Sequence, residues 1–304
     1  CRRRLRLADS PVYPFCAVVG REREKLALLL HAIHPRLGGV LLGGEAGTAK
    51  STLVRGLAEL LPYRRIAIPP HATEDRLLGG LDAEYAIRSG RRRLTAGLLA
   101  EADGGLIAVD DANRMPERLL KEILRASADG EFVVEREGLS ERRASRFRLL
   151  GTMNPAEEPM SPAQLDRWAL FVRVDPTGNV GERSEIVRRR LAFERDPVAF
   201  ARRWEAESAA LRTRIAAAER RLAGVVLGED MLRFIAETAA AGGCPGHRAE
   251  LALGEASRAL AAWEGCPEVL PGHVREAAVY ALAHRLTAGG AADPRLARAG
   301  VRAR

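Results

Sequence analysis

The chain has 304 residues, of which 47% are hydrophobic and 29% are charged, and its formal net charge is +8. This length and composition allow one large or two modest globular domains, and they exclude a disordered or fibrous protein. No apolar run approaches the roughly 20 residues that a membrane-spanning helix needs, so we expect a soluble chain. The opening stretch, CRRRLRLADS, lacks the apolar core of a secretion signal, which favours a cytoplasmic location.

The positive charge does not by itself indicate a nucleic-acid partner. Only three of the 48 Lys and Arg residues are lysines, and aromatic residues make up 5% of the chain. Proteins that bind single strands interleave aromatic with basic side chains, and that pattern is missing here. We therefore attribute the charge to an arginine-rich composition and predict no nucleic-acid partner.

The four cysteines, Cys1, Cys16, Cys244 and Cys266, form no CxxC pair and lie beside no histidine pair. This spacing indicates neither a zinc site nor a disulfide framework, so we expect reduced thiols.

From residue 17 onwards, short β-branched runs alternate with amphipathic helical stretches, which is typical of a parallel α/β sheet. The expected strands are 17–20, 40–42, Arg65–Ile68, Gly105–Val109, Phe147–Gly151 and Leu170–Val174. Helices are expected in most intervals, including 112–125, and a hairpin is expected at 131–147 with its turn at Gly138. We predict that this first domain spans 1–175.

The second half of the chain is expected to be helical. Over 176–222 the apolar residues Trp204, Leu211, Ile215 and Leu222 recur on one helix face, which predicts a long connecting helix. A small all-helical domain is predicted over 223–288, with helices at 248–262 and 271–286. We predict a disordered tail over 289–304.

A phosphate-binding loop follows the apolar run at 40–42. It comprises Gly44, Glu45, Ala46, Gly47, Thr48, Ala49, Lys50, Ser51 and Thr52. Such a loop points backbone N–H groups and a helix N-terminus at an anion, with a lysine for the β- and γ-phosphates of ATP and a hydroxyl for Mg²⁺. Ala49 departs from the glycine of this Walker A pattern. The alternative interpretation is a glycine-rich turn with a surface lysine.

A pair of carboxylates follows the expected strand at 105–109. Asp110 there can hold the water shell of Mg²⁺, together with Ser51, and Asp111 can polarise an attacking water. The pair is therefore interpreted as a Walker B motif. The alternative is an N-cap for the helix expected at 112–125, because Asp is favoured at that position.

With both motifs placed, the chain resembles an AAA+ ATPase, and more narrowly the ATPase subunits of magnesium chelatase and the related cobalt chelatases. The resemblance spans about residues 13–286 and includes YPF at 13–15, ATEDR at 72–76, VEREG at 134–138, LDR at 165–167 and HRAEL at 247–251. It implies an AAA+ P-loop NTPase domain with a parallel sheet and hairpin insertions, one before the Walker B strand and one after it. It also implies a C-terminal all-helical lid domain.

Three further site residues follow from the resemblance. Asn154 matches the sensor-1 residue that orients the hydrolytic water, Arg167 matches the arginine finger supplied to the neighbouring subunit, and Arg248 matches sensor 2. Taken singly, Asn154 before a proline would indicate a turn, and each arginine a solvated side chain.

The resemblance implies an ATPase that uses ATP and Mg²⁺, in a homo-oligomeric ring or a ring with a homologous subunit. Such a ring would drive metal insertion into a tetrapyrrole by a separate, larger catalytic subunit. Magnesium or cobalt, and an I-type subunit or the N-terminal part of a D-type subunit, stay open. Asp111 stands where active members usually have Glu, so a weakly hydrolysing scaffold is one alternative. A MoxR-like chaperone ATPase is another, and a DNA-remodelling ATPase is indicated only by charge.

Overall fold

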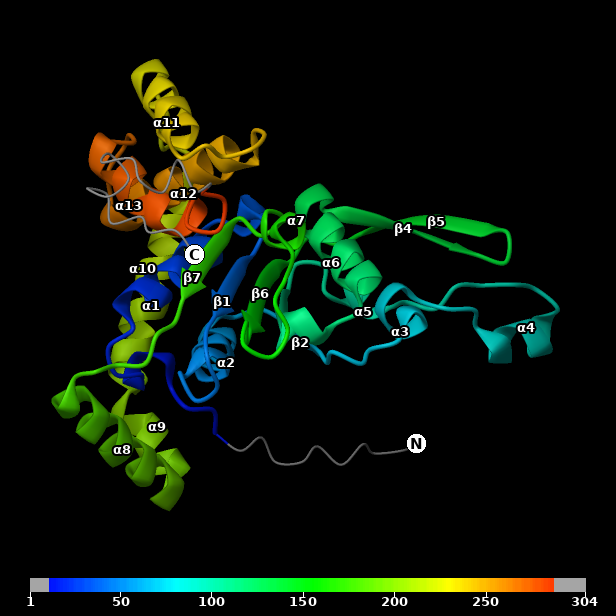
Figure 1. Cartoon of the computed structure of the whole chain (residues 1–304). Coiled ribbons are helices and arrows are strands. Elements are labelled where there is room, and N and C mark those ends of the chain that lie inside the picture. Colours follow the sequence, from blue (N-terminus) through cyan, green and yellow to red (C-terminus); the bar gives the residue numbers. More distant parts are fainter. Residues whose placement is uncertain (1–10, 287–304) are drawn as a thin grey trace.

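Parallel strands build the central sheet in the order β2-β3-β6-β1-β7. The strands are β1 (Val40–Gly43), β2 (Arg65–Ile68), β3 (Leu106–Val109), β6 (Arg148–Met153) and β7 (Leu170–Arg173). The computed structural model describes residues 11–286 and confirms the α/β class (Figure 1). Because neighbouring strands are parallel, the carboxyl ends of β1, β3 and β6 meet at one edge, with β6 in the middle. Ligands of open α/β sheets bind at this edge.

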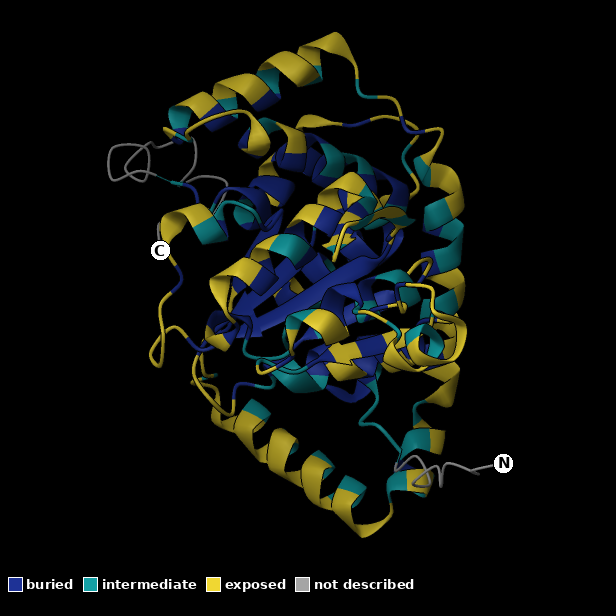
Figure 2. Cartoon of the chain, turned by 90° about the vertical axis from the view of Figure 1, so that its right-hand side faces the viewer, coloured by how far each residue is buried: buried dark blue, intermediate teal, exposed yellow. Residues whose placement is uncertain are grey.

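Helices cover both faces of the sheet, which explains why its strands are apolar without alternation. One face packs against α1 (Glu22–Ile33) and α2 (Lys50–Leu60), the other against α6 (Glu117–Asp129) and the short helices α3 (Glu74–Leu78) and α5 (Leu98–Glu101). Figure 2 shows the strands buried between helices whose outer faces are exposed.

The predicted helical lid is confirmed. It consists of α11 (Glu229–Ala241), α12 (Arg248–Glu264) and α13 (Pro271–Ala281), and α10 (Glu205–Leu222) precedes it. The hydrophobic cluster around α1 and α2 continues without a break into α10, α12 and α13. Helix α12 lies against α1, and α13 lies against β7, so the lid shares a core with the sheet. The domain limits at 175, 222 and 288 stay predictions.

The strand predicted at 17–20 is wrong. The chain forms a 3₁₀ turn, η1 (Phe15–Ala17), and then Gly20 and Arg21 adopt positive φ angles of 61° and 63°, which ends any extended run. Val18 is buried in the cluster around α1 and α2 instead of pairing with a strand. A second short 3₁₀ turn, η2 (Pro35–Leu37), leads into β1.

The single long helix predicted within 176–222 is also wrong, because the chain forms α8 (Val180–Arg195), α9 (Pro197–Arg203) and then α10. Proline disfavours helical geometry in the preceding residue, so α8 ends before Pro197. The side chain of Asp196 then caps α9 by accepting from the backbone N–H of Ala199. Helix α13 is likewise shorter than predicted and ends at Ala281.

Of the two predicted hairpin insertions, only the second is a hairpin. It is formed by β4 (Glu131–Arg136) and β5 (Leu139–Ala144), whereas the first consists of α3, α4 (Ala83–Ser89) and α5, with one isolated bridge between Leu81 and Leu94. Figure 1 shows α4 and the β4–β5 hairpin projecting from the sheet on the same side. The guanidinium of Arg143 joins them through the carbonyl oxygen of Thr95, at 2.6 Å.

The helix predicted at 112–125 begins later than expected. Ala112–Arg114 form a 3₁₀ turn, η3, and α6 starts at Glu117 after Pro116.

The predicted tail lies outside the described residues, as does Cys1. Cys16, Cys244 and Cys266 are free thiols, as predicted. Between residues 11 and 286, no helix has the length and apolar character that crossing a membrane requires.

Candidate functional site

The predicted phosphate loop connects β1 to α2, with the helix beginning at Lys50. Two of its glycines are required by the backbone. Gly47 has a φ of 80°, and a Cβ on Gly44 would lie 2.3 Å from the carbonyl oxygen of Val174. The loop therefore packs closely against Val174, the residue after β7, and then turns sharply into the N-terminus of α2. This geometry directs N–H groups at an anion.

Lys50 is not the surface lysine of the alternative interpretation, because only 7% of it is exposed. Its ammonium donates to the carbonyl oxygens of Gly44 and Glu45 at 2.6 and 2.7 Å, so the side chain folds back over the loop. Burial lowers the pKa of Lys50, and the nearby carboxylates of Asp111 and Asp110 oppose that shift. The amine is thus held in the loop with both carboxylates in electrostatic range.

Ala49 adopts a left-handed conformation, with φ at 72°. This is the position at which the Walker A pattern has glycine, and glycine adopts positive φ without steric cost. The alanine therefore keeps the loop geometry at a strain cost of about 1–2 kcal/mol.

The carboxylate of Asp110 joins the two predicted motifs. Its Oδ1 accepts the Ser51 hydroxyl at 2.7 Å, and its Oδ2 accepts from the guanidinium of Arg55 at 3.0 Å. Burial raises the pKa of Asp110, but the hydrogen bonds from Thr152, Ser51 and Arg55 outweigh it and hold that pKa below the usual value. An ionised carboxylate next to a hydroxyl is the kind of oxygen ligand pair that Mg²⁺ prefers.

Thr152 is a site residue that sequence reasoning missed. Its hydroxyl donates to Oδ1 of Asp110 and accepts from the backbone N–H of Asp111 at 3.1 Å, so it orients both acidic residues. The available signal was topological: Thr152 lies on β6, and β6 pairs with β3, whose carboxyl end the two aspartates follow. The sequence did not reveal that pairing.

Asp111 does not act as the helix cap of the alternative interpretation. It precedes η3 with a left-handed φ of 49°, and its side chain makes no capping hydrogen bond. Within residues 11–286 its carboxylate has no hydrogen-bond donor, although it lies in the electrostatic environment of Lys50. The carboxylate is therefore available to a ligand.

Asn154 follows β6 and is 8% exposed. Its amide donates to Oε1 of Glu157 at 2.8 Å, and its Oδ1 accepts from the N–H of Ala156, so the turn expected from the Asn-Pro sequence is present. Asn113 supports this turn by donating to the carbonyl oxygens of Asn154 and Glu158. Asn154 thus lies at the same sheet edge as Asp110, with its side chain bonded to Glu157.

The two predicted arginines belong to a separate group. Arg167 follows α7 (Pro162–Leu165), and within residues 11–286 its guanidinium has no hydrogen bond, ion pair or ring contact. Arg248 begins α12 and donates to Oδ2 of Asp166 at 2.8 Å. The structure therefore brings Lys50, Ser51 and the aspartates together, whereas both arginines lie around Asp166.

A cavity of about 500 Å³ adjoins the start of the phosphate loop. Its lining includes Gly43, Glu45, Pro155, Asp175, Tyr280 and Ala283. The cavity therefore extends from the carboxyl edge of the sheet to the lid helix α13. Its size is that of a small-molecule site, and it lies where open α/β sheets bind ligands.

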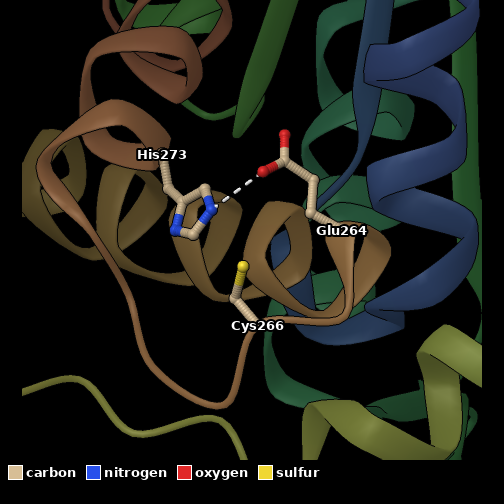
Figure 3. Close-up of side chains that lie close together, drawn as sticks. All are labelled: Glu264, Cys266 and His273. Carbon is tan, nitrogen blue, oxygen red and sulfur yellow. Dashed lines mark hydrogen bonds and ion pairs between the residues drawn. The ribbon is translucent and has the colours of Figure 1, made fainter.

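Glu264, Cys266 and His273 form a second cluster of side chains (Figure 3). The backbone N–H of Leu270 donates to Nδ1 of His273 at 2.9 Å, so the neutral ring carries its proton on Nε2, which lies 3.0 Å from Glu264. A metal would need the lone pair of Nε2, because Nδ1 is already engaged. We therefore interpret the cluster as a structural cap of α13.

Comparison with known proteins identifies the two domains of the chain. Residues 39–168 match the family model of the AAA domain (dynein-related subfamily), and residues 232–302 match that of the AAA lid domain. An uncharacterized protein of Mycobacterium tuberculosis is 44% identical over 90% of this chain, which spans 44% of that longer protein. The fold is also shared with a protein of Cytophaga hutchinsonii, with a TM-score of 0.64 and 21% identity over 90% of this chain and 84% of the other.

Other relatives of this chain have chelatase names. A magnesium-chelatase subunit ChlI homolog of Methanocaldococcus jannaschii is 38% identical over 90% of this chain and 86% of its own length. The magnesium-chelatase 38 kDa subunit of Chlorobaculum tepidum is 38% identical over 90% and 80%. A structure of the magnesium-chelatase BchI–BchD complex matches with a TM-score of 0.52 and 36% identity over 95% of this chain and 99% of the other. The chain therefore belongs to the AAA+ family of the ChlI and BchI subunits of magnesium chelatase.

Proposed function

We propose that the protein binds MgATP at the carboxyl edge of the sheet. The hydrogen bond between Ser51 and Asp110 carries this proposal, because it places a hydroxyl and an ionised carboxylate beside the phosphate loop. Both groups suit Mg²⁺, which would neutralise charge on the β- and γ-phosphates when bound. Lys50 would exchange its carbonyl contacts for phosphate oxygens, and the cavity of about 500 Å³ beside the loop would take the nucleobase.

For hydrolysis, we assign the positioning of the attacking water to Asp111 and Asn154. The carboxylate of Asp111 is unbonded within the described residues and can accept a proton from water, while Thr152 fixes its backbone. Asn154 would have to exchange Glu157 for the water. Arg248 would leave Asp166 to reach the phosphates of its own subunit.

The guanidinium of Arg167, which has no partner among the described residues, supports a ring. An arginine finger acts on the nucleotide of a neighbouring subunit, so within its own chain it has no partner to find. We propose a homo-oligomeric ring, or a ring with a homologous subunit, in which Arg167 completes the next active site. The BchI–BchD complex among the structural relatives is consistent with such an assembly.

The biological role proposed for the ring is that of a chelatase motor. ATP hydrolysis would drive insertion of Mg²⁺, or of cobalt, into a tetrapyrrole held by a larger catalytic subunit. The names of the relatives support magnesium. The alternatives are a MoxR-like chaperone ATPase and a weakly hydrolysing scaffold, the latter favoured by the strained Ala49 and the short carboxylate of Asp111.

Reconstitution tests this role. The protein is combined with the large chelatase subunit, a porphyrin substrate, MgATP and either Mg²⁺ or Co²⁺, and metalloporphyrin formation is followed by fluorescence. We expect insertion that depends on ATP and disappears with Lys50→Ala. Brisk ATP hydrolysis with no insertion of either metal would instead favour the chaperone alternative, and nucleotide binding without hydrolysis would favour the scaffold.

A further inference from the structure

The segment that carries Arg167 is held from both sides. It links α7 to β7, and Trp168, next to Arg167, is fully buried. The indole packs so closely on β6 that a Cβ on Gly151 would lie 2.4 Å from it. On the other side, Asp166 accepts from lid residues. Arg167 is therefore a half-buried residue whose side chain has no hydrogen-bond or ion-pair partner within residues 11–286, between two residues that are fixed.

Arg285 makes the tightest of these contacts. Its Nε donates to Oδ1 of Asp166 at 2.9 Å, and its Nη2 donates to the carbonyl oxygens of Asp166 and Trp168, each at 2.7 Å. Its Nη1 donates to the carbonyl oxygens of Ala169 and Ala281. A guanidinium has five N–H groups, so every one of them is used.

This arrangement is more than a surface ion pair. The Arg285 side chain is 2% exposed, and its contacts include the backbone on both sides of Arg167. His284 adds a contact from Nε2 to the carbonyl oxygen of Trp168 at 3.0 Å. The turn after α13 thus holds the backbone of residues 166–169, here called the finger segment, while the side chain of Arg167 takes no part in these contacts.

Asp166 also connects Arg285 to Arg248, at the start of α12. Its Oδ1 faces Arg285, and its Oδ2 accepts from Arg248, whose side chain is 61% exposed. Burial raises the pKa of Asp166, but these two arginines outweigh it and keep the carboxylate ionised at neutral pH. Asp166 therefore contacts Arg248, the proposed sensor 2 of the lid, and directly precedes Arg167, the proposed finger.

We propose that Arg285 and Asp166 are positioning residues that hold Arg167 in place for the nucleotide of the neighbouring subunit. Their effect is exerted in trans, on the next active site around the ring, and not on the site of their own chain. The proposal rests on the proposed ring ATPase. A displacement of about 1 Å at a reacting group can cost on the order of 100-fold in rate. Loss of the Arg285 contacts should therefore slow hydrolysis strongly.

The test uses Arg285→Lys, which keeps the charge but cannot make the forked contacts. Alone, this variant should hydrolyse ATP about 10–100-fold more slowly, with its Kd for MgATP unchanged. Arg275→Lys, which lies on α13, is exposed and makes none of the contacts to residues 166–169, is the matched control and should keep the parental rate. Circular dichroism and sizing verify folding and assembly. If Arg285→Lys fails to fold, Asp166→Asn, which is nearly isosteric, takes its place.

Mixed rings then separate the two sites on which Arg285 could act. Lys50→Ala subunits have an intact finger and a dead loop, so they should rescue Arg285→Lys. Arg167→Ala subunits have an intact loop and no finger, so they should give no rescue. The opposite pattern, rescue by Arg167→Ala and none by Lys50→Ala, would place the effect in the variant's own site and overturn the proposal, as would a parental rate for Arg285→Lys alone.

The control mixture is Lys50→Ala with Arg167→Ala, which should regain activity because some interfaces combine an intact loop with an intact finger. If this control stays inactive although sizing shows mixed oligomers, the proposed ring mechanism itself fails. Failure of the positioning role and failure of the proposed function are therefore distinguished.

Discussion

The phosphate loop and the finger segment are built in opposite ways. At the loop, the polar groups bond to one another within the chain: Lys50 to loop carbonyls, Ser51 to Asp110, and Thr152 to both acidic residues. At the finger segment, the backbone and the flanking residues are fully engaged, while the guanidinium of Arg167 has no partner within residues 11–286. One region is a nearly complete site, and the other supplies a single charged group.

The difference shows how an active site can be divided between copies of one chain. The loop needs pre-organised donors that stay in place when charge develops, so its groups are fixed by hydrogen bonds. The finger needs a fixed base and a free end, because its partner lies in another molecule. Because Arg285 follows α13 of the lid and contacts the residues on both sides of Arg167, the lid can link the two regions.

Removal of the Arg167 guanidinium should have the largest effect on the rate of ATP hydrolysis. Arg167→Ala is expected to slow ATP hydrolysis by about 10³–10⁵-fold, because the charge on the transferred phosphoryl group loses its stabilising partner. The affinity for MgATP, measured by fluorescence titration, should change little. A large loss of nucleotide affinity would mean that Arg167 acts at its own loop.

Changes at Asp111 should have the second largest effect on the rate and should not alter the position of Arg167. Asp111→Asn is expected to lower kcat by about 10²–10⁴-fold, since the amide cannot accept the proton from water. Asp111→Glu should raise kcat, because the longer carboxylate reaches closer to the γ-phosphate. Steady-state kinetics at saturating ATP measures both. Two variants with parental kcat would remove Asp111 from the mechanism.

Thr152 tests whether the loop region depends on its internal bonds. Thr152→Val keeps the shape but removes the hydroxyl that orients both aspartates, so kcat should fall about 10–100-fold. Thr152→Ser restores the hydroxyl and should recover most of the activity. Equal losses in the two variants would point to packing of the methyl group as the cause.

The strain at Ala49 should produce a smaller, thermodynamic effect. Ala49→Gly is expected to stabilise the protein by about 1 kcal/mol, because glycine adopts the positive φ without a steric cost. Gly47→Ala, where the added Cβ meets nothing within 4 Å but φ is 80°, should destabilise it by a similar amount. Urea unfolding measures both. Shifts of the same sign would show that φ is not the cause.

The ion pairs of Asp166 should give the smallest effect on stability, and the size of this effect should change only in acid. Because the folded-state pKa of Asp166 lies below its usual value of about 3.9, the carboxylate stabilises the fold above that value. This contribution is lost as pH falls through the folded-state pKa. The stability difference between the parent and Asp166→Asn should be constant from pH 7 to about 5 and should shrink below about pH 4. A difference that grew in acid would contradict the assignment.

The sequence was sufficient for the features that depend on local pattern. The run of four apolar residues in β3 and the glycines of the loop predicted the strand edge at which Asp110 and Lys50 meet. Three errors came from turn chemistry. The positive φ at Gly20 and Arg21 is incompatible with the predicted strand, and Pro116 and Pro197 shifted or split predicted helices.

The missed contacts depend on tertiary pairing. Thr152 reaches Asp110 only because β6 inserts between β3 and β1, and a strand order is not readable from a single strand. Arg285 reaches Asp166 across 119 positions of sequence, and its position on a predicted helix gave no sign of a buried role. Periodicity and motifs therefore do not predict long-range contacts such as that between Arg285 and Asp166.

The shared hydrophobic cluster also affects how the molecule unfolds. Leu42 of β1, Leu28 of α1, and Leu253 of α12 are all fully buried in this cluster, so the lid cannot separate from the sheet without exposing apolar surface on both. Elements with a common core unfold as a cooperative unit. Calorimetry should therefore record one main transition for the sheet and the lid, and ligands bound at the loop should raise the melting temperature of both together.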